Sequence, residues 1–160
     1  MKGITMQELL TSFEGRIGRG KWWLGAVVLI VFSIIFAIVV GLLFGDGIIA
    51  RLLTLLLTFA VLYASAALAT KRLADRGTPA MPRLVIFFGP SILFSIIDTF
   101  RIGYRAAPEM GGMGMNGAMM PGTIAMTLGF ISLVVSIWAL VELGILKGDA
   151  EENRFGPPPA

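Results

Sequence analysis

The side chains that could carry out chemistry in this chain are few in kind. The 160 residues include no cysteine and no histidine, which excludes thiol catalysis, disulfides, His-ligated metals and Ser-His-Asp relays. Carboxylates, lysines, arginines, tyrosines and hydroxyls remain, and their spacing forms no catalytic constellation. We therefore predict that the protein is not an enzyme and has no cofactor-binding site.

Glu142 is a carboxylate within a long apolar stretch. An ionisable group in such a place is costly and is usually paired or functional. Glu142 precedes Lys147 by about 7 Å of helix rise, so its side chain could reach the membrane interface. It could also pair with Lys71 or Arg72. A proton relay is the alternative role for this candidate intramembrane carboxylate.

The densest polar stretch of the chain runs from Lys71 to Arg83 and separates two long apolar runs. Its basic residues are Lys71, Arg72, Arg76 and Arg83. So many charges are not tolerated in the hydrocarbon of a bilayer. We predict that this stretch is a loop at a membrane face.

The composition indicates an integral membrane protein. Hydrophobic residues make up 56% of the chain and charged residues 14%, with a mean hydropathy of +0.86, whereas soluble domains have about 25% charged residues. The net charge is +3. The basic residues flank the apolar runs instead of forming one patch, which favours a role in membrane topology over nucleic-acid binding.

Four apolar runs predict an all-α membrane protein with four transmembrane helices in a bundle, in one domain over residues 1–160. The first run has 21 uncharged residues, which as a helix would be roughly 32 Å long, enough for a hydrocarbon core of about 30 Å. The predicted spans are about 24–44, 48–70, 84–104 and 123–146.

The third of these spans has the shortest uncharged run of the four. Only 84–97 is free of charge, and Pro90 interrupts it. The helix must continue to Tyr104 to reach spanning length, which would place Asp98 one turn before Arg101 as an ion pair. A re-entrant hairpin is the alternative.

The N-terminal segment carries a helix start signal. Thr5-Met6-Gln7-Glu8 fits the capping-box pattern, and the apolar residues that follow recur at helical spacing. We predict a short interfacial helix over residues 4–13, with its apolar stripe among the lipid headgroups.

Two further segments are unusual in composition. The loop 106–122 has five methionines among eleven residues, from Met110 to Met120. Thioethers suit Cu(I), although a mobile, weakly apolar loop explains the same composition. The tail 147–160 is polar and then rich in proline, and we expect it to be extended.

The distribution of basic residues predicts that both termini lie in the cytoplasm. With four spans, ten of the thirteen basic residues fall on the side of the termini, as the positive-inside rule requires of the cytoplasmic side. These ten are Lys2, Arg16, Arg19, Lys21, Lys71, Arg72, Arg76, Arg83, Lys147 and Arg154.

Three motifs, near the two ends and in the centre of the chain, resemble those of the bacterial family called domain of unknown function 805. The opening motif comprises Phe13, Gly15, Arg16, Ile17, Arg19, Trp22 and Trp23. The central motif comprises Arg72, Leu73, Asp75 and Gly77, and the closing one Glu152, Asn153, Arg154, Phe155, Gly156, Pro157 and Pro159. Ala74 replaces the histidine that is usual in the central motif.

This resemblance implies a bacterial inner (plasma) membrane protein with no established activity. With an even number of spans, the three motifs share the cytoplasmic face, and we hypothesise a polar cluster there that caps the bundle. Its candidate residues are Arg16, Arg19, Arg72, Asp75, Asn153 and Arg154.

The function that we expect from these observations is that of a non-enzymatic structural or accessory membrane component. Its partners would be the lipid bilayer and a second copy or another membrane protein, without nucleic acid. The alternatives are a small-solute or ion transporter or channel that uses Glu142, and copper handling through the methionine-rich loop.

Overall fold

A computed structural model describes residues 4–106 and 119–159, and most of this part is helical. The short helix α1 (Met6–Thr11) precedes the long helices α2 (Arg19–Phe44), α3 (Ile48–Asp75), α4 (Arg83–Thr99) and α5 (Thr123–Leu140), and α5 continues into a π-helical turn, η1 (Val141–Ile145). Two short strands, β1 (Arg105–Ala106) and β2 (Met119–Met120), pair antiparallel between α4 and α5.

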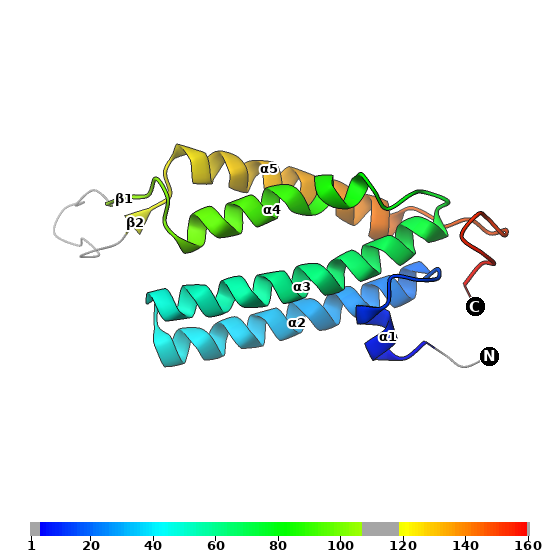
Figure 1. Cartoon of the computed structure of the whole chain (residues 1–160), viewed down its shortest axis with the longest axis horizontal. Coiled ribbons are helices and arrows are strands. Elements are labelled where there is room, and N and C mark those ends of the chain that lie inside the picture. Colours follow the sequence, from blue (N-terminus) through cyan, green and yellow to red (C-terminus); the bar gives the residue numbers. More distant parts are fainter. Residues whose placement is uncertain (1–3, 107–118, 160) are drawn as a thin grey trace.

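The four long helices form two antiparallel hairpins that lie side by side (Figure 1). Helices α2 and α3 form one hairpin and α4 and α5 the other, and α3 packs against α4. Within the described residues, α2 contacts the second hairpin only through η1. Helix α1 and the C-terminal tail lie at one end of the bundle, and the β1–β2 pair lies at the other.

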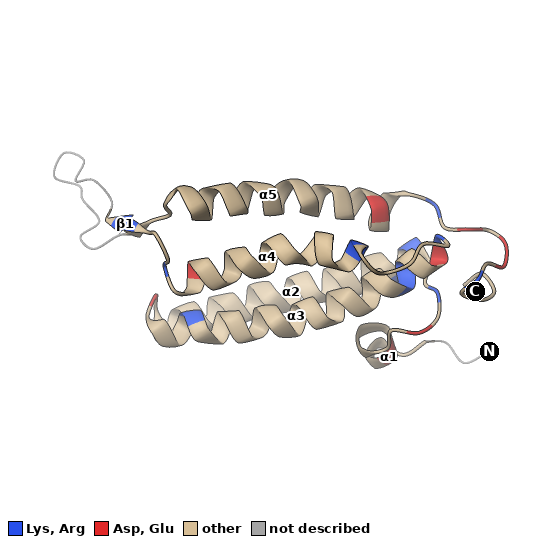
Figure 2. Cartoon of the chain, turned by 45° about the horizontal axis from the view of Figure 1, so that its top comes forward, with Lys and Arg blue, Asp and Glu red and all other residues tan. Residues whose placement is uncertain are grey.

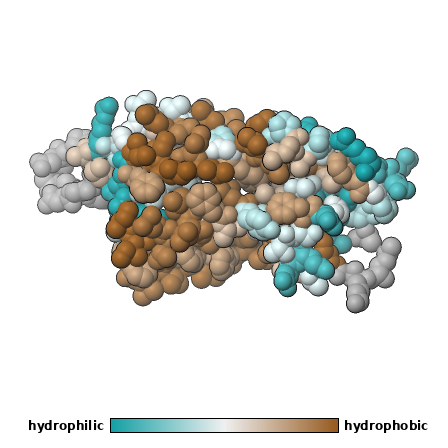
Figure 3. Space-filling view, viewed as in Figure 1, coloured by the Kyte–Doolittle hydropathy of each residue, from teal (hydrophilic) through white to brown (hydrophobic). Residues whose placement is uncertain are grey.

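Three helical segments are long and apolar enough to cross a membrane: Arg19–Phe44, Ile48–Asp75 and Thr123–Ile145. Large apolar side chains cover their outer surfaces, as in Leu42, which is 82% exposed. Figure 3 shows this apolar surface over the middle of the molecule and hydrophilic residues toward its ends, and the charged residues of the helices gather at the same two ends (Figure 2). Such a surface is suited to lipid and unsuited to water.

Helix α4 is shorter than the predicted span. It has 17 residues and ends at Thr99, so the prediction that it continues to Tyr104 is wrong. The backbone turns at Arg101, which has a φ of 51°, a conformation that a helix cannot contain. Arg101 pairs with Asp46 instead of Asp98, and Asp98 accepts a hydrogen bond from the Tyr104 hydroxyl.

Helix α3 is longer than predicted, because the first part of the polar stretch is helical. We predicted a loop from Lys71, but α3 continues to Asp75. Lys71 and Arg72 have no exposed surface, and Asp75 is 3% exposed. These residues can remain in a helix because protein groups, and not water, satisfy their charges.

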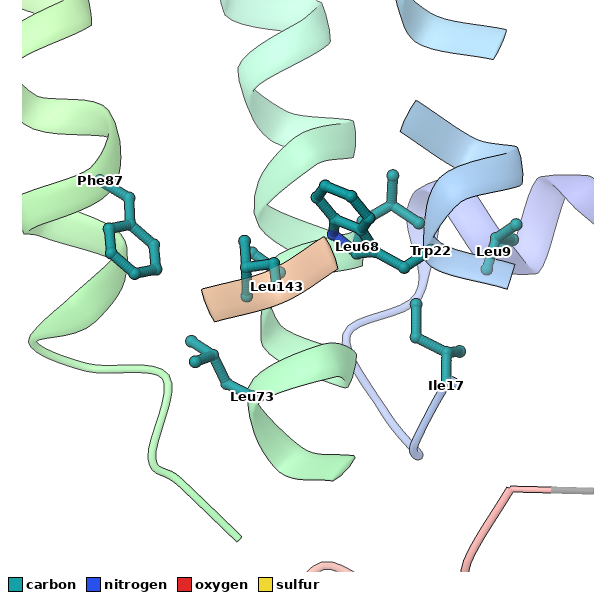
Figure 4. Packing of buried hydrophobic residues seen from close by; sticks show 8 residues of the cluster. Leu9, Ile17, Trp22, Leu68, Leu73, Phe87 and Leu143 are labelled. Atoms are coloured by element: carbon teal, nitrogen blue, oxygen red, sulfur yellow. The ribbon is translucent and has the colours of Figure 1, made fainter. Parts of the chain in front are cut away.

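A compact apolar core lies at the end of the bundle that carries α1 (Figure 4). Leu143 of η1 lies among the side chains of the other helices there, and the members of the core are Leu9, Ile17, Trp22, Leu68, Ala69, Leu73, Phe87 and Leu143. The predicted capping box forms at Thr5 and Glu8, but α1 extends only to Thr11. The core and the charged end of the bundle are therefore neighbours.

Candidate functional site

Five consecutive carbonyl oxygens at the end of the last long helix each accept a hydrogen bond from a side chain of α2 or α3, or of the turn after α3. The bonds are Arg76 Nη1 to Glu142 O (3.1 Å), Arg72 Nε to Leu143 O (2.8 Å), Trp23 Nε1 to Gly144 O (3.1 Å), Arg19 Nη1 to Ile145 O (3.2 Å), and Arg72 Nη2 to Leu146 O. A helix C-terminus leaves its last carbonyls unpaired and carries a partial negative charge. Four of the five bonds come from arginines, whose cationic donors satisfy both requirements at once.

Arg72 is the central donor of this arrangement. Its side chain has no exposed surface, and its guanidinium bonds to two carbonyls of the last helix and to the Asp75 carboxylate one turn further along α3. The planar guanidinium with its five donors can make these contacts together, whereas an ammonium group cannot reproduce that geometry.

Arg16 binds Asp75 from the N-terminal segment. Its Nη2 lies 3.2 Å from Asp75 Oδ1, and the two side chains are 2% and 4% exposed. The same guanidinium donates to the carbonyls of Asp149 (2.7 Å), Glu151 (3.0 Å) and Gly156 (2.7 Å). Arg16 therefore ties the C-terminal tail to the end of α3.

Glu142 is buried, with 6% of its surface exposed, and it pairs with two arginines. Arg83 Nε lies 2.9 Å and Arg76 Nη1 3.2 Å from its Oε1. The predicted pairing with Lys71 or Arg72 is wrong. Arg72 instead donates to the Asp75 carboxylate and to the carbonyls of Leu143 and Leu146. Lys71 Nζ donates to the carbonyls of Glu8 (2.9 Å) and Leu9 (2.6 Å) in α1.

We call seven of the charged side chains at this end of the bundle the polar clamp: Arg16, Arg19, Arg72, Asp75, Arg76, Arg83 and Glu142. It joins the N-terminal segment, the end of α3, the start of α4, the η1 turn and the tail.

The tail is folded, not extended as we predicted. Asn153 and Gly156 exchange two backbone hydrogen bonds around a tight turn. Asn153 Nδ2 donates to Ala74 O (3.1 Å), and Arg154 Nη2 donates to Gly77 O (3.1 Å). The closing motif therefore lies on the turn that follows α3.

The structure brings the six candidate cluster residues to one end of the molecule, in different roles. Arg16, Arg72 and Asp75 form ion pairs, and Arg19 binds a carbonyl of η1. The last two, Asn153 and Arg154, bind backbone carbonyls of 74–77 and do not join the ion pairs.

The sequence does not indicate the partners of four residues of this region. The topology alone accounts for Arg76 and Arg83, and Lys71 is expected in a loop or beside Glu142. Trp23 belongs to an aromatic pair that is typical of membrane interfaces. Nothing in these patterns indicates a backbone carbonyl as the partner.

Gly148 lies in close contact with the Arg72–Asp75 pair. A Cβ atom at this position would lie 1.9 Å from Asp75 Oδ2 and 2.9 Å from Arg72 Nη1. The next residue, Asp149, donates its N–H to Asp75 O at 2.8 Å. Glycine is therefore required for the tail to approach the buried ion pair.

Within the described ranges, no group of three or more His, Asp or Glu side chains could hold a metal ion. The copper hypothesis concerns the methionine-rich loop, of which residues 107–118 lie outside the described part. Met119 and Met120 of β2 are both exposed.

The fold and this site define a class: a mainly helical protein whose long apolar helices are suited to crossing a membrane and are joined at one end by buried ion pairs. The chain belongs to the family described as "Protein of unknown function (DUF805)", whose model matches residues 10–157. The resemblance of its three motifs is thereby confirmed.

Two curated relatives were found in Escherichia coli, both called "Uncharacterized protein YiiR", one from strain K12 and one from O157:H7. Each is 25% identical to this chain over 159 residues, which cover 96% of this chain and 89% of the relative. No solved structure matches.

Proposed function

We propose that this protein is a structural or accessory component of the bacterial inner membrane, with four spans and no enzymatic activity, and that the polar clamp fastens its two hairpins together. The observation that carries this proposal is the set of five capped carbonyls, because their donors come from the first hairpin and the turn that follows it, whereas the carbonyls belong to the second hairpin. Such a joint stabilises one arrangement of helices.

The fourth span in this proposal is α4. Its 17 residues give a helix of about 26 Å, a little short of a hydrocarbon core of about 30 Å. The turn from Phe100 to Tyr104 extends the crossing, with Arg101 and Asp46 paired at that end. An even number of spans agrees with the position of α1 and the tail at one end of the bundle (Figure 1).

The contacts within the clamp support a structural role over a catalytic one. The guanidiniums of Arg16 and Arg72 are occupied by a carboxylate and by backbone carbonyls. Glu142 is held by two arginines. Groups that are committed to such contacts have little capacity left to bind or activate a substrate.

A partner within the membrane would use the exposed small-residue face of α2. Ala37 and Gly41 lie on this face, which borders a cavity at the end of the bundle opposite the clamp, and a Cβ atom on Gly41 would meet no atom within 4 Å. Small residues allow helices to approach closely in membranes. We propose that a second copy or another membrane protein packs on this face.

The absence of native cysteine allows a direct test of topology. Single cysteines at Asp46 and Thr78, at opposite ends of α3, are exposed in turn to a membrane-impermeant thiol reagent in intact cells whose outer membrane is permeable to it. We expect labelling at position 46 alone, with labelling at position 78 only after the inner membrane is opened. Labelling of position 78 in intact cells would overturn the proposed orientation.

The accessory role is tested by the mass of the purified protein in mild detergent and by cross-linking at Gly41→Cys, with Gly20→Cys as the control. A disulfide between copies at position 41, or a co-purified membrane protein that Gly41→Leu displaces, supports the proposal. A monomer that captures nothing in either experiment contradicts it.

Transport is a second candidate function, because a cavity of about 290 Å³ with several polar lining residues lies at the opposite end from the clamp. Arg51, Thr54, Thr58, Ser95 and Asp98 contribute to its lining. Proteoliposomes that show monovalent-ion flux, with the flux reduced by Asp98→Asn and by Glu142→Gln, would favour transport over the accessory role.

A further inference from the structure

A second, larger cavity lies between the two hairpins in the half of the bundle next to the clamp. Its volume is about 470 Å³, and residues of all four long helices line it. Most of the lining is apolar, and it includes Ala26, Ile30, Leu62, Phe88, Ala139 and Leu140. Ligand sites in proteins have volumes of about 300 to 1,000 Å³ and a largely apolar lining.

The cavity opens sideways between α2 and α5. In the described part of the chain the backbones of these two helices do not approach each other closely, and the lining residues Ile30, Ile34 and Leu140 are 54%, 53% and 42% exposed. The lining residues of α3 and α4, such as Leu62 and Phe88, are less exposed. If the long helices cross a bilayer, this opening faces the acyl chains of the lipid.

Water is a poor occupant for this cavity. A buried water needs two to four polar partners, and apolar cavities stay dry. The lining has one serine from each long helix, Ser33, Ser65, Ser91 and Ser136, whereas its other side chains are apolar and offer water almost no partner. An empty cavity would forfeit the dispersion contacts of its whole lining. An acyl chain from the bilayer restores them.

The clamp end of the cavity offers positive charge for a headgroup. Trp22 and Leu143 line the cavity at this end. Nearby, Arg19 of α2 is hydrogen-bonded to Ile145 O. Lys21 is two residues after Arg19, and Lys147 is two residues after Ile145. The phosphate of a lipid whose chain lies in the cavity would lie at this end of the bundle, where Arg19, Lys21 and Lys147 make the chain basic.

We propose that this cavity is a binding site for one acyl chain of an anionic phospholipid, with the headgroup at the basic end of the bundle that carries Lys21 and Lys147. The lipid would fill the space between the hairpins beside the clamp. This inference rests on the membrane-spanning arrangement proposed above, and it adds a ligand to it.

The test uses the full-length protein in nanodiscs of phosphatidylglycerol and phosphatidylcholine, with a photoactivatable group on the acyl chain of one lipid at a time. Labelled peptides are identified by mass spectrometry. We expect phosphatidylglycerol to label the cavity-lining residues of α2 and α5. Ala139→Phe, which fills the cavity, should abolish this labelling, and Ala60→Phe, which places the same ring on an exposed face of α3, should leave it unchanged.

Size-exclusion chromatography shows whether Ala139→Phe folds. If it does not, Ala139→Leu, which fills less of the cavity, replaces it. The double variant Lys21→Gln/Lys147→Gln should lose the preference for phosphatidylglycerol while it keeps labelling by either lipid. Equal labelling of the wild type, Ala139→Leu and Ala60→Phe would show general contact with bulk lipid and overturn the proposal. Cross-links between two copies at the cavity would overturn it in favour of a protein occupant.

The cysteine-labelling pattern at positions 46 and 78 is independent of cavity occupancy. If the cysteine at position 46 alone is labelled in intact cells but the lipid probe does not label the cavity, only the lipid site is rejected. If the cysteine at position 78 is also labelled in intact cells, the proposed topology is rejected.

Discussion

Arg16 and Asp75 are 59 residues apart in the sequence, and in the folded chain they form an ion pair with 3.2 Å between Nη2 and Oδ1. Asp75 also binds Arg72, so one buried carboxylate joins two guanidiniums from separate segments. Through Arg16 the same contact reaches the tail. This carboxylate is the point at which the three motifs of the family meet, and it is the most sensitive position for testing the clamp.

Replacement of Asp75 should be strongly destabilising. Asp75→Asn leaves the buried guanidiniums of Arg16 and Arg72 without a carboxylate, and removing one partner of a buried pair costs about 3 to 5 kcal/mol. We expect a clear loss of the free energy of unfolding, measured in mild detergent by titration with a denaturing detergent. Asp46→Asn is the control, because the Asp46 side chain is 77% exposed and such pairs are worth about 0 to 1 kcal/mol. Equal losses in both variants would contradict the central role of Asp75.

Replacement of Glu142 should cost less than replacement of Asp75. The side chains of its partners Arg76 and Arg83 are 20% and 35% exposed, so water can hydrate them when Glu142→Gln removes the carboxylate. After discounting for this screening we expect a loss of about 1 to 2 kcal/mol, measured in the same titration. A loss as large as that of Asp75→Asn would show that water does not hydrate the two arginines when the carboxylate is removed.

Conversion of Arg72 to lysine should destabilise the protein although the charge is kept. The guanidinium bonds to Leu143 O, Leu146 O and Asp75, and an ammonium on a flexible stem cannot reach all three. Hydrogen bonds to charged groups are worth about 1.5 to 3 kcal/mol, so we expect a loss of about 2 kcal/mol. The exposed residue Arg105 of β1 provides the matched control, since Arg105→Lys should be neutral. Hydrogen exchange at 143–148 should also increase in Arg72→Lys alone.

Introduction of a methyl group at Gly148 should release the tail. Its Cβ would overlap Asp75 Oδ2, and the tail would have to leave Arg16 to relieve the overlap. Limited proteolysis should then cleave Gly148→Ala after Lys147 or Arg154 faster than the wild type. Gly20→Ala is the control, because that position is helical and open. An unchanged cleavage rate in Gly148→Ala would show that the tail is not held by this contact.

Acidification should weaken the capping box of α1. The hydrogen bonds that Glu8 accepts, first from the Thr5 backbone and then from its hydroxyl, lower the Glu8 pKa below its ordinary value of 4.5. Because the pKa is lower in the folded state, this stabilisation is fully present above pH 4.5 and is lost as the pH falls through the folded-state pKa. Hydrogen exchange at the first amides of α1 should increase over that range, and Thr5→Ala should show a weaker dependence on pH.

The positions of the long helices, apart from the C-terminal ends of α3 and α4, and the polar ends of the molecule could be predicted from the amino-acid sequence. Apolar runs of about 20 residues have few alternatives to a membrane-crossing helix. The pattern at Thr5 and Glu8 likewise indicates a local hydrogen-bond exchange, which requires no distant partner. Both features depend on residues that are close together in the chain.

The tertiary structure alone decided how the charges at the clamp are satisfied. The sequence indicates a loop from Lys71 because charged residues are usually hydrated by water. Only the folded chain shows that Lys71 binds carbonyls of α1 and that Arg72 binds the Leu143 carbonyl of η1. Backbone carbonyls are the same in every residue and carry no sequence signature. Their partners here are separated by up to 140 residues, so contacts of this kind are determined by the packing of helices and not by local spacing.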